Sequence, residues 1–293
     1  MIEPAYCHVD QPIGVKDMTK TIFITGVSSG FGRALSQAAL AEGHKVVGTL
    51  RNEEAREEFE ALKPGFAFGR LLDVTDTAAI APVIAAVENE VGPIDVLVNN
   101  AGYGHEGLVE ESSIEDLRHQ FEVNVFGPVA VIQAVLPYMR KRRSGHILNI
   151  TSMGGIITMP GIAFYHGSKF ALEGISESLG KEVKSFGIHV TAVEPGGFRT
   201  DWAGRSMVRA ERSIADYDEV FEPLRQRRLE RSGRQAGDPK KAAAAMLTLI
   251  ASENPPAHLL LGRDAISLVR EKLGSLKTEF DAWEQVSGST DFE

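Results

Sequence analysis

The chain has 293 residues, of which 43% are hydrophobic and 24% charged, and its net charge is -9. These values are typical of a globular protein with one large α/β domain or two small ones. The acidic balance argues against broad affinity for nucleic acid or anionic lipid, because both are polyanions. The single cysteine, Cys7, excludes an internal disulfide and a cysteine-rich metal site.

Residues 1–19 contain acids and prolines where a signal peptide needs a basic start and an apolar middle. No run of apolar residues in the sequence approaches the length of a membrane span. One cysteine fits a reducing compartment. We therefore expect a cytoplasmic protein without a membrane segment, in which residues 1–19 form an arm outside the folded domain.

Short runs rich in β-branched residues alternate with helical patterns along residues 20–263. The predicted strands are 21–25, 45–50, 69–74, 95–99, 146–151, 189–194 and 258–262. The predicted helices lie near 30–42, 52–62, 77–91, 113–142, 164–186 and 239–252. Such alternation predicts a parallel sheet with right-handed crossovers and helices on both faces, a doubly wound α/β fold. No repeat and no linker divides the chain, so we expect one domain.

Two further segments lie outside this alternation, residues 201–238 and the C-terminal extension 264–293. The first follows the sixth strand and is more helical than disordered in pattern. Ligands of open α/β sheets bind at the carboxyl ends of the strands, so residues 201–238 should roof a substrate site. The apolar side chains expected around that site are Trp202, Met207, Val208, Tyr217, Phe221 and Leu224, with Met153, Ile156, Ile157, Met159 and Phe164.

A glycine-rich turn, "TGVSSGFG", joins the first strand to the first helix. Gly26, Gly30 and Gly32 allow a tight turn and a close approach of the backbone to a pyrophosphate, whose charge sits on the free N–H groups of the helix. The alternative is a strand-to-helix turn that binds nothing. The context of strand, turn and helix favours a dinucleotide.

The end of the second strand bears on the choice of dinucleotide. An NAD site expects an acid there for the ribose hydroxyls, whereas an arginine accommodates a 2′-phosphate. Leu50 and Arg51 occupy this position, and Ser28 and Ser29 add hydroxyl donors from the turn. NADP(H) is therefore favoured over NAD(H), the alternative being that Arg51 is an ordinary surface residue.

Five motifs occur in a fixed order: "TGVSSGFG", "NNAG" at 99–102, Ser152, "YHGSK" at 165–169, and "PGGFRT" at 195–200. With these motifs the chain resembles the short-chain dehydrogenase/reductase family over about residues 20–263. The resemblance implies a Rossmann fold with a seven-stranded parallel sheet and a nicotinamide cofactor across its carboxyl edge. It also implies that Asn124, Ser152, Tyr165 and Lys169 form the catalytic tetrad.

The predicted cofactor-binding residues combine the glycine turn and Arg51 with positions that the resemblance supplies. By that resemblance, Asp73 and Val74 contact adenine, residues 100–102 lie near the ribose, and Thr200 binds the nicotinamide carboxamide. The full set is Gly26, Ser28, Ser29, Gly30, Phe31, Gly32, Arg51, Asp73, Val74, Asn100, Ala101, Gly102, Tyr165, Lys169, Pro195, Gly196 and Thr200.

Physical chemistry supports the tetrad independently. Tyr165 and Lys169 are four residues apart and share a helix face, so the ammonium should lower the phenol pKa from about 10 toward the working pH. Ser152 follows a strand and can hold the substrate oxygen by a second hydrogen bond. Asn124 is a poor helix former in mid-helix; by resemblance, the main chain opens there to hold a water that links Lys169 to solvent.

The histidines carry no predicted role. His166 follows Tyr165 directly and should point away from the catalytic face. His105, His119 and His146 have no metal-ligand spacing to a cysteine or carboxylate cluster. We predict no metal.

We therefore expect an NADP(H)-dependent oxidoreductase that interconverts a secondary alcohol and a ketone, or an aldehyde, on a medium-to-bulky apolar substrate. The chain looks similar to the branch with hydroxysteroid and retinol dehydrogenases. Reduction of an activated C=C bond is an alternative, but the relatives that do this on acyl carriers space Tyr and Lys further apart. A dinucleotide-binding sensor is another alternative, which should have lost Tyr165 or Lys169. A homo-oligomer, dimer or tetramer, is expected through the helices at 113–142 and 164–186.

Overall fold

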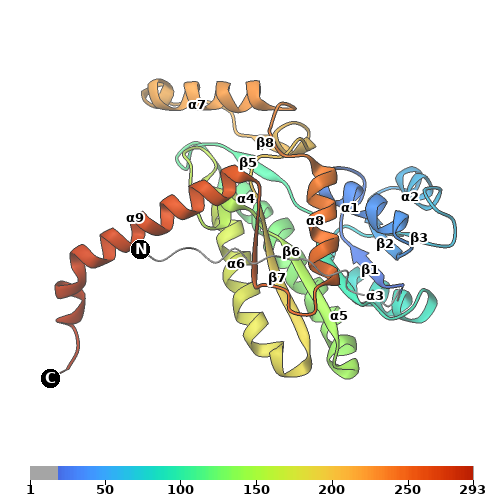
Figure 1. Cartoon of the computed structure of the whole chain (residues 1–293). Coiled ribbons are helices and arrows are strands. Elements are labelled where there is room, and N and C mark those ends of the chain that lie inside the picture. Colours follow the sequence, from blue (N-terminus) through green and yellow to red (C-terminus); the bar gives the residue numbers. More distant parts are fainter. Residues whose placement is uncertain (1–18, 293) are drawn as a thin grey trace.

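The computed structural model describes residues 19–292, so the predicted N-terminal arm lies outside the described residues except for Thr19. A parallel seven-stranded sheet forms the centre, in the order β3-β2-β1-β4-β6-β7-β9 (Figure 1). Its strands are β1 (Thr21–Ile24), β2 (Lys45–Leu50), β3 (Ala67–Leu71), β4 (Val96–Asn99), β6 (Gly145–Ile150), β7 (Ile188–Pro195) and β9 (His258–Leu261). The order reverses between β1 and β4, which confirms the doubly wound fold.

Helices cover both faces of this sheet (Figure 1). The α-helices of the described residues are α1 (Gly30–Ala41), α2 (Glu53–Glu60), α3 (Thr77–Glu90), α4 (Ile114–Phe121), α5 (Gly127–Arg142), α6 (Ala163–Val183), α7 (Asp218–Arg231), α8 (Pro239–Ala251) and α9 (Arg263–Gly288). Of these, α7 and the second half of α9 lie away from the sheet faces (Figure 1). Neighbouring strand residues point to opposite faces. Ile22 and Ile24 therefore join the core beneath α1 and α8, whereas Phe23 joins the core beneath α3, α5 and α6.

Local sequence explains where several helices begin. Ser113 and Asp116 form a reciprocal capping box at the start of α4. Asn52 and Asp76 accept backbone N–H groups at the starts of α2 and α3, and Asp238 does the same for α8. Such caps satisfy N–H groups that have no partner inside the helix.

The segment 201–238 is largely helical, as its pattern predicts. It contains the short helix Asp201–Ala203, β8 (Met207–Arg209), a helical turn at Ala215–Tyr217, and α7. The sequence does not predict β5 (Gly104–Glu106), which pairs with β8 in a parallel two-stranded sheet outside the main one. Three-residue strands this far apart in sequence leave no periodic pattern to read.

The predicted helix at 113–142 is present as the helical run Ile114–Arg142, but its high hydropathy is not anticipated from the sequence. By length and composition alone it could cross a membrane, because an 18-residue window within it has a mean hydropathy of 1.3. Val131, Val135 and Met139 of this run are fully buried against the sheet. Core packing therefore accounts for its apolar character.

Candidate active site

The carboxyl ends of β1 and β4 bring the glycine turn and the "NNAG" motif together. Asn100 Nδ2 donates to the carbonyl oxygens of Thr25 and Gly26 at 2.9 and 2.7 Å. Gly26 has a φ of 71°, and a Cβ there would lie 3.1 Å from the Cα of Ala101. Only glycine fits both the left-handed backbone and the close approach, so the two predicted motifs form one packed unit.

The start of α1 fits an anionic dinucleotide. Unlike α2, α3, α4 and α8, this helix has no side-chain cap, because Ser29 makes no capping hydrogen bond. The uncapped N–H groups and the helix dipole favour a phosphate group. Thr200, from the segment after β7, lies beside this turn. A Cβ added to Gly30 would be 3.7 Å from the Cβ of Thr200. The cradle is thus built from the ends of β1, β4 and β7.

The ends of β2 and β3 hold the residues predicted near the adenosine. Arg51 is exposed directly after β2. Burial raises the pKa of Asp73, but its hydrogen bonds from Thr75 and the nearby charge of Arg51 outweigh that effect, so the pKa is lowered overall. Val74 is buried and packs against Gly127 at the start of α5.

The loop after β7 contains the predicted Pro195 and Gly196. Asp264 at the start of α9 accepts the Gly197 N–H at 2.7 Å, and a Cβ on Gly196 would lie 2.3 Å from its Oδ1. The tail of the chain therefore holds the "PGG" loop in place. Phe31 packs edge-on against Phe198 of the same loop, with ring centroids 5.1 Å apart.

Tyr165 and Lys169 lie one turn apart on α6, and both side chains are buried. The Lys169 ammonium donates to the Ile150 carbonyl at 2.8 Å and lies 5.8 Å from the centre of the Tyr165 ring. Ser152 follows β6, and its hydroxyl accepts the Gly154 N–H at 2.9 Å. The structure thus brings the three predicted side chains to one edge of the sheet.

The pKa of Tyr165 shifts in the direction opposite to the one predicted from the sequence. Burial raises the pKa of Tyr165 to about 12, against a smaller lowering by the Ser152 hydroxyl. Burial also lowers the pKa of Lys169 to about 8, with Glu173 opposing this shift. The predicted lowering of the phenol pKa is therefore wrong for this structure, because desolvation of the buried phenol outweighs the hydrogen bond with Ser152.

Asn124 lies in a π-helical turn, Glu122–Phe126, between α4 and α5. Its amide donates to the Tyr103 carbonyl and to Ser168, at 3.0 and 3.1 Å, and its oxygen accepts the Tyr103 N–H at 3.1 Å. A π-turn interrupts the regular helical hydrogen bonds and is frequent at functional sites. Asn124 thus ties α6 to the loop after "NNAG", and the helix opens where the resemblance places an opening.

The sequence analysis assigns no role to His166. Its ring is buried, with Nδ1 2.7 Å from the Gly154 carbonyl, and Nε2 accepts the Met159 N–H at 2.8 Å. Burial lowers the pKa of His166, so the neutral ring donates from Nδ1 and accepts at Nε2. His166 therefore fixes the loop that follows Ser152. Its position beside Tyr165 in sequence is the one signal that could have indicated this.

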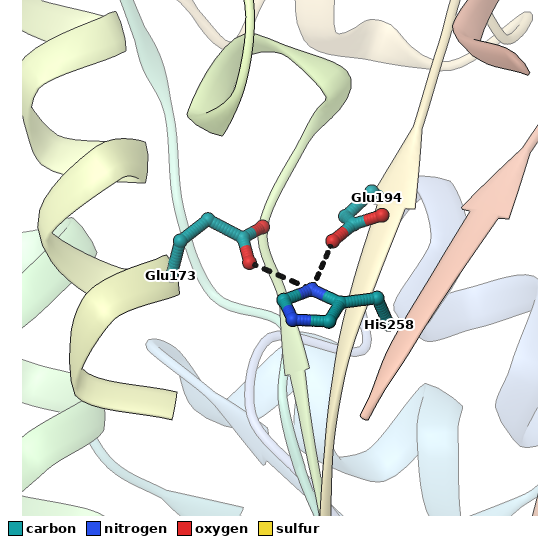
Figure 2. A group of neighbouring side chains, drawn as sticks. All are labelled: Glu173, Glu194 and His258. Carbon is teal, nitrogen blue, oxygen red and sulfur yellow. Dashed lines mark hydrogen bonds and ion pairs between the residues drawn. The ribbon is translucent and has the colours of Figure 1, made fainter. Parts of the chain in front are cut away.

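The structure also places three ionisable side chains behind Lys169. Glu173 of α6 and Glu194 of β7 are buried and converge on His258 of β9 (Figure 2). His258 Nδ1 lies 2.7 Å from Glu194 Oε1 and 3.6 Å from Glu173 Oε2. Burial raises the pKa of Glu173 to about 7, and burial also raises that of Glu194.

No sequence spacing could reveal this cluster, because its members are far apart in the chain. One ligand atom from each residue lies within 4.8 Å of the others. The contact between His258 and Glu194 is at hydrogen-bond distance, so we interpret the group as a hydrogen-bonded cluster of two buried carboxyl groups and a partly exposed histidine. The absence of a metal remains a prediction.

Residues 201–238, which we call the cover, lie over the catalytic side chains. The Trp202 ring lies 5.0 Å from the Tyr165 ring, and Phe221 is buried against Gly161. Two of the residues predicted to line the substrate site face solvent instead. Val208 is exposed, and Tyr217 is exposed with its hydroxyl donating to Glu110 at 2.6 Å. The inner side of the cover therefore contains some, but not all, of the apolar residues that were predicted to line the substrate site.

Buried carboxylates attach this cover to the body. Glu106 of β5, with its side chain 2% exposed, faces three arginines of the cover, with nitrogen-to-oxygen distances of 3.4 Å to Arg209, 3.6 Å to Arg225 and 3.0 Å to Arg228. Glu111 holds Arg212 and accepts the Ser213 and Ile214 N–H groups. Sequence reasoning missed both carboxylates, because only the pairing of β5 with β8 brings these charges together.

Known proteins are similar to this chain in sequence and in fold. "Oxidoreductase BOA17" of Botryotinia fuckeliana is 38% identical over 92% of this chain and 98% of its own length. A "3-ketodihydrosphingosine reductase" of Bacteroides thetaiotaomicron is 38% identical over 82% of this chain and 87% of its own. A solved short-chain dehydrogenase of Streptomyces avermitilis superposes with a TM-score of 0.87 at 43% identity, covering 93% of this chain and 98% of that chain.

Two more distant solved structures were determined with a dinucleotide. A short-chain dehydrogenase/reductase of Burkholderia phymatum contains NAD, with 25% identity and a TM-score of 0.77. A serine dehydrogenase contains NADP+, with 26% identity and a TM-score of 0.70. These similarities support a nicotinamide dinucleotide as the cofactor here. The sequence model of the family described as "short chain dehydrogenase" matches residues 20–209, and the chain belongs to this family of oxidoreductases.

Proposed function

We propose that the protein is an NADP(H)-dependent oxidoreductase that interconverts a secondary alcohol and a ketone, or an aldehyde, on a medium-to-bulky apolar substrate. The observation that carries this proposal is the convergence of Ser152, Tyr165 and Lys169 at the sheet edge that also holds the uncapped start of α1. A phenol, a hydroxyl and an ammonium beside a dinucleotide cradle suit proton transfer to a carbonyl oxygen.

Each side chain has a distinct task in this reaction. The bound nicotinamide supplies or accepts the hydride. The Tyr165 hydroxyl, protonated because burial raises its pKa to about 12, gives its proton to the substrate oxygen in reduction and takes it back in oxidation. Ser152 donates a second hydrogen bond that orients the carbonyl. Lys169 holds positive charge close to the phenol and would also bind the cofactor ribose.

The preference for NADP(H) rests on Arg51. No acid stands at the end of β2, and Arg51 is exposed there, where a 2′-phosphate can reach its guanidinium. Its charge already acts on Asp73 at the end of the next strand. The arginine is therefore close to the predicted adenine position.

The apolar substrate class rests on the cover of residues 201–238. The Trp202 ring lies beside the Tyr165 ring, and Phe164, the residue before Tyr165, stacks on His105. The apolar part of a substrate whose carbonyl reaches Tyr165 would therefore meet aromatic surfaces. The name of the Bacteroides relative indicates a ketone on a long aliphatic chain, which is the same class. A small charged sugar would leave these aromatic faces without a partner.

The test follows the oxidation of NADPH and NADH by absorbance across long-chain ketones, cyclic ketones, steroids and retinoids. We expect turnover with apolar carbonyls and NADPH. Tyr165→Phe should abolish turnover and keep NADPH binding, measured by cofactor fluorescence, whereas Tyr138→Phe on α5 should keep both. Binding without turnover in the unmodified protein would instead support a dinucleotide sensor, and no binding of either dinucleotide would overturn the proposal.

A further inference from the structure

Three ionisable side chains follow one another along the buried face of α6. Tyr165, Lys169 and Glu173 are spaced four residues apart, which places them on one side of the helix. They are 7%, 7% and 8% exposed. Glu177, four residues further along, is exposed and pairs with Lys181 at 2.6 Å, because steps of four slowly rotate around a helix of 3.6 residues per turn. The buried column therefore ends in a carboxyl group one turn beyond the Lys169 ammonium.

Glu173 also contacts the turn that follows Ser152. A Cβ added to Gly155 would lie 2.7 Å from the Cγ of Glu173 and 3.0 Å from the carbonyl oxygen of Lys169. The missing side chain at Gly155 thus allows this turn to pack directly on α6 at both residues. The carboxyl group is held at the back of the catalytic edge, between the helix and the end of β6.

The ammonium of Lys169 needs a negative charge nearby. Its Nζ donates to the neutral carbonyl of Ile150 at 2.8 Å, and this bond orients the group without supplying a full charge. Burial disfavours the charged form of a lysine and lowers the pKa of Lys169 to about 8, and the charge of Glu173 opposes this shift. The charged state of Lys169 therefore depends on the carboxylate behind it.

The surroundings of Glu173 decide how readily it ionises. Glu194 of β7 and His258 of β9 converge on its carboxyl group (Figure 2). The like charge of Glu194 opposes the ionisation of Glu173, whereas the positive charges of His258 and Lys169 favour it. The side chain of His258 is 46% exposed, so this end of the cluster reaches solvent. Glu177, on the same helix as Glu173, also interacts with His258.

We propose that Glu173 is a positioning residue whose carboxylate, held beside Glu194 and His258, is the countercharge that keeps the buried Lys169 ammonium protonated behind Tyr165. The inference rests on the proposed function, in which Lys169 holds positive charge close to the phenol. Glu173 acts through Lys169, because about two turns of α6 separate it from Tyr165.

The test measures the pKa of Lys169 directly, by NMR titration of protein with isotope-labelled lysine Cε atoms. The signal is assigned by its loss in Lys169→Met. Glu173→Gln should lower this pKa by about one pH unit, because the amide keeps the shape and removes the countercharge. Glu173→Asp keeps the charge and should retain most of the original pKa. Glu177→Gln is the matched control, since it makes the same change one turn further along α6 at an exposed position, and should leave the pKa of Lys169 unchanged.

Glu194→Gln separates a charge effect from a packing effect. It removes the like charge beside Glu173, so Glu173 ionises more readily and the pKa of Lys169 should not fall. A general loosening of the cluster would instead lower the pKa of Lys169 in both glutamine variants. An unchanged Lys169 pKa in Glu173→Gln, or an equal fall in Glu194→Gln, would overturn the proposal.

The same variants should change the pH dependence of carbonyl reduction. Since the reaction uses the Lys169 ammonium, kcat should fall as the pH rises through the pKa of Lys169, and Glu173→Gln should move this fall about one pH unit lower. A fall in kcat that stays in place although the pKa of Lys169 has moved would overturn the catalytic part of the proposal. No turnover by the unmodified protein would overturn the proposed function alone, because the NMR titration needs no substrate.

Discussion

Glu106 is expected to control the closure of the cover over the catalytic site. Its side chain is 2% exposed and faces Arg209, Arg225 and Arg228, which are 19 to 30% exposed. Glu106→Gln keeps the shape and removes the charge that the three arginines share. Because those arginines remain partly solvated, the loss is that of one charge-assisted hydrogen bond, about 2 kcal/mol, and not that of a fully buried pair.

That free energy corresponds to about a 30-fold increase in the ratio of open to closed cover. In the proposed function the substrate binds beneath the cover, whereas the dinucleotide binds to the glycine turn. The variant should therefore raise the Michaelis constant for the substrate and leave the dissociation constant of NADPH within about twofold. The arginine-rich residues 205–234 should also become more sensitive to trypsin, since trypsin cleaves only where the chain can open locally.

Glu110→Gln is the matched control, because it makes the same charge change nearby, but Glu110 contacts the cover through an exposed hydrogen bond from Tyr217. Steady-state kinetics and limited proteolysis of both variants test the reasoning. It fails if Glu106→Gln behaves like Glu110→Gln in proteolysis, or if NADPH affinity falls as much as substrate affinity.

Three further results are expected. Arg51→Asp should weaken NADPH binding about 30-fold through loss of a charge-assisted phosphate contact, with little change for NADH; fluorescence titration checks this, and equal losses for both would contradict the NADP assignment. Burial lowers the pKa of His146 to about 3. The His146 ring therefore stays neutral in the folded protein, whereas in the unfolded chain it takes up a proton below its usual pKa of 6.5. Stability is therefore lost as the pH falls from 6.5 toward 3, and His146→Gln should flatten that decline in urea unfolding by up to about 1.4 kcal/mol per pH unit; an unchanged slope would count against the burial argument. Burial raises the pKa of Glu173 to about 7 from 4.5, so ionising it costs stability as the pH rises through this range, and Glu173→Gln should lose less stability than the unmodified protein between about pH 5 and 8; a steeper loss would show that the ionised carboxylate stabilises the fold.

Much of the site is readable from the sequence, because its residues sit at positions that local rules define. The glycine turn follows a strand and opens a helix, and Tyr165 and Lys169 share a face one turn apart. Each of the seven predicted strands has a counterpart in the sheet, because β-branched runs bounded by turns fit a buried parallel sheet. Short-range patterns of this kind need no knowledge of distant residues.

Other features exist only in three dimensions. Glu106, with its three arginines, comes into place through the pairing of β5 with β8, and Glu173 meets Glu194 and His258 because α6 lies over β7 and β9. The pKa of Tyr165 is raised and not lowered because burial, which no spacing in the sequence reveals, outweighs the hydrogen bond with Ser152.

The sequence by itself predicted the doubly wound fold and the glycine turn of the cradle, since periodicity and turn signals act between neighbours in the chain, and the resemblance of its ordered motifs to a known family pointed to the candidate catalytic side chains. The tertiary structure decided the protonation of those side chains, the attachment of the cover and the exposure of the second half of α9. These depend on which distant groups exclude water from one another, and desolvation is a property of the packed whole.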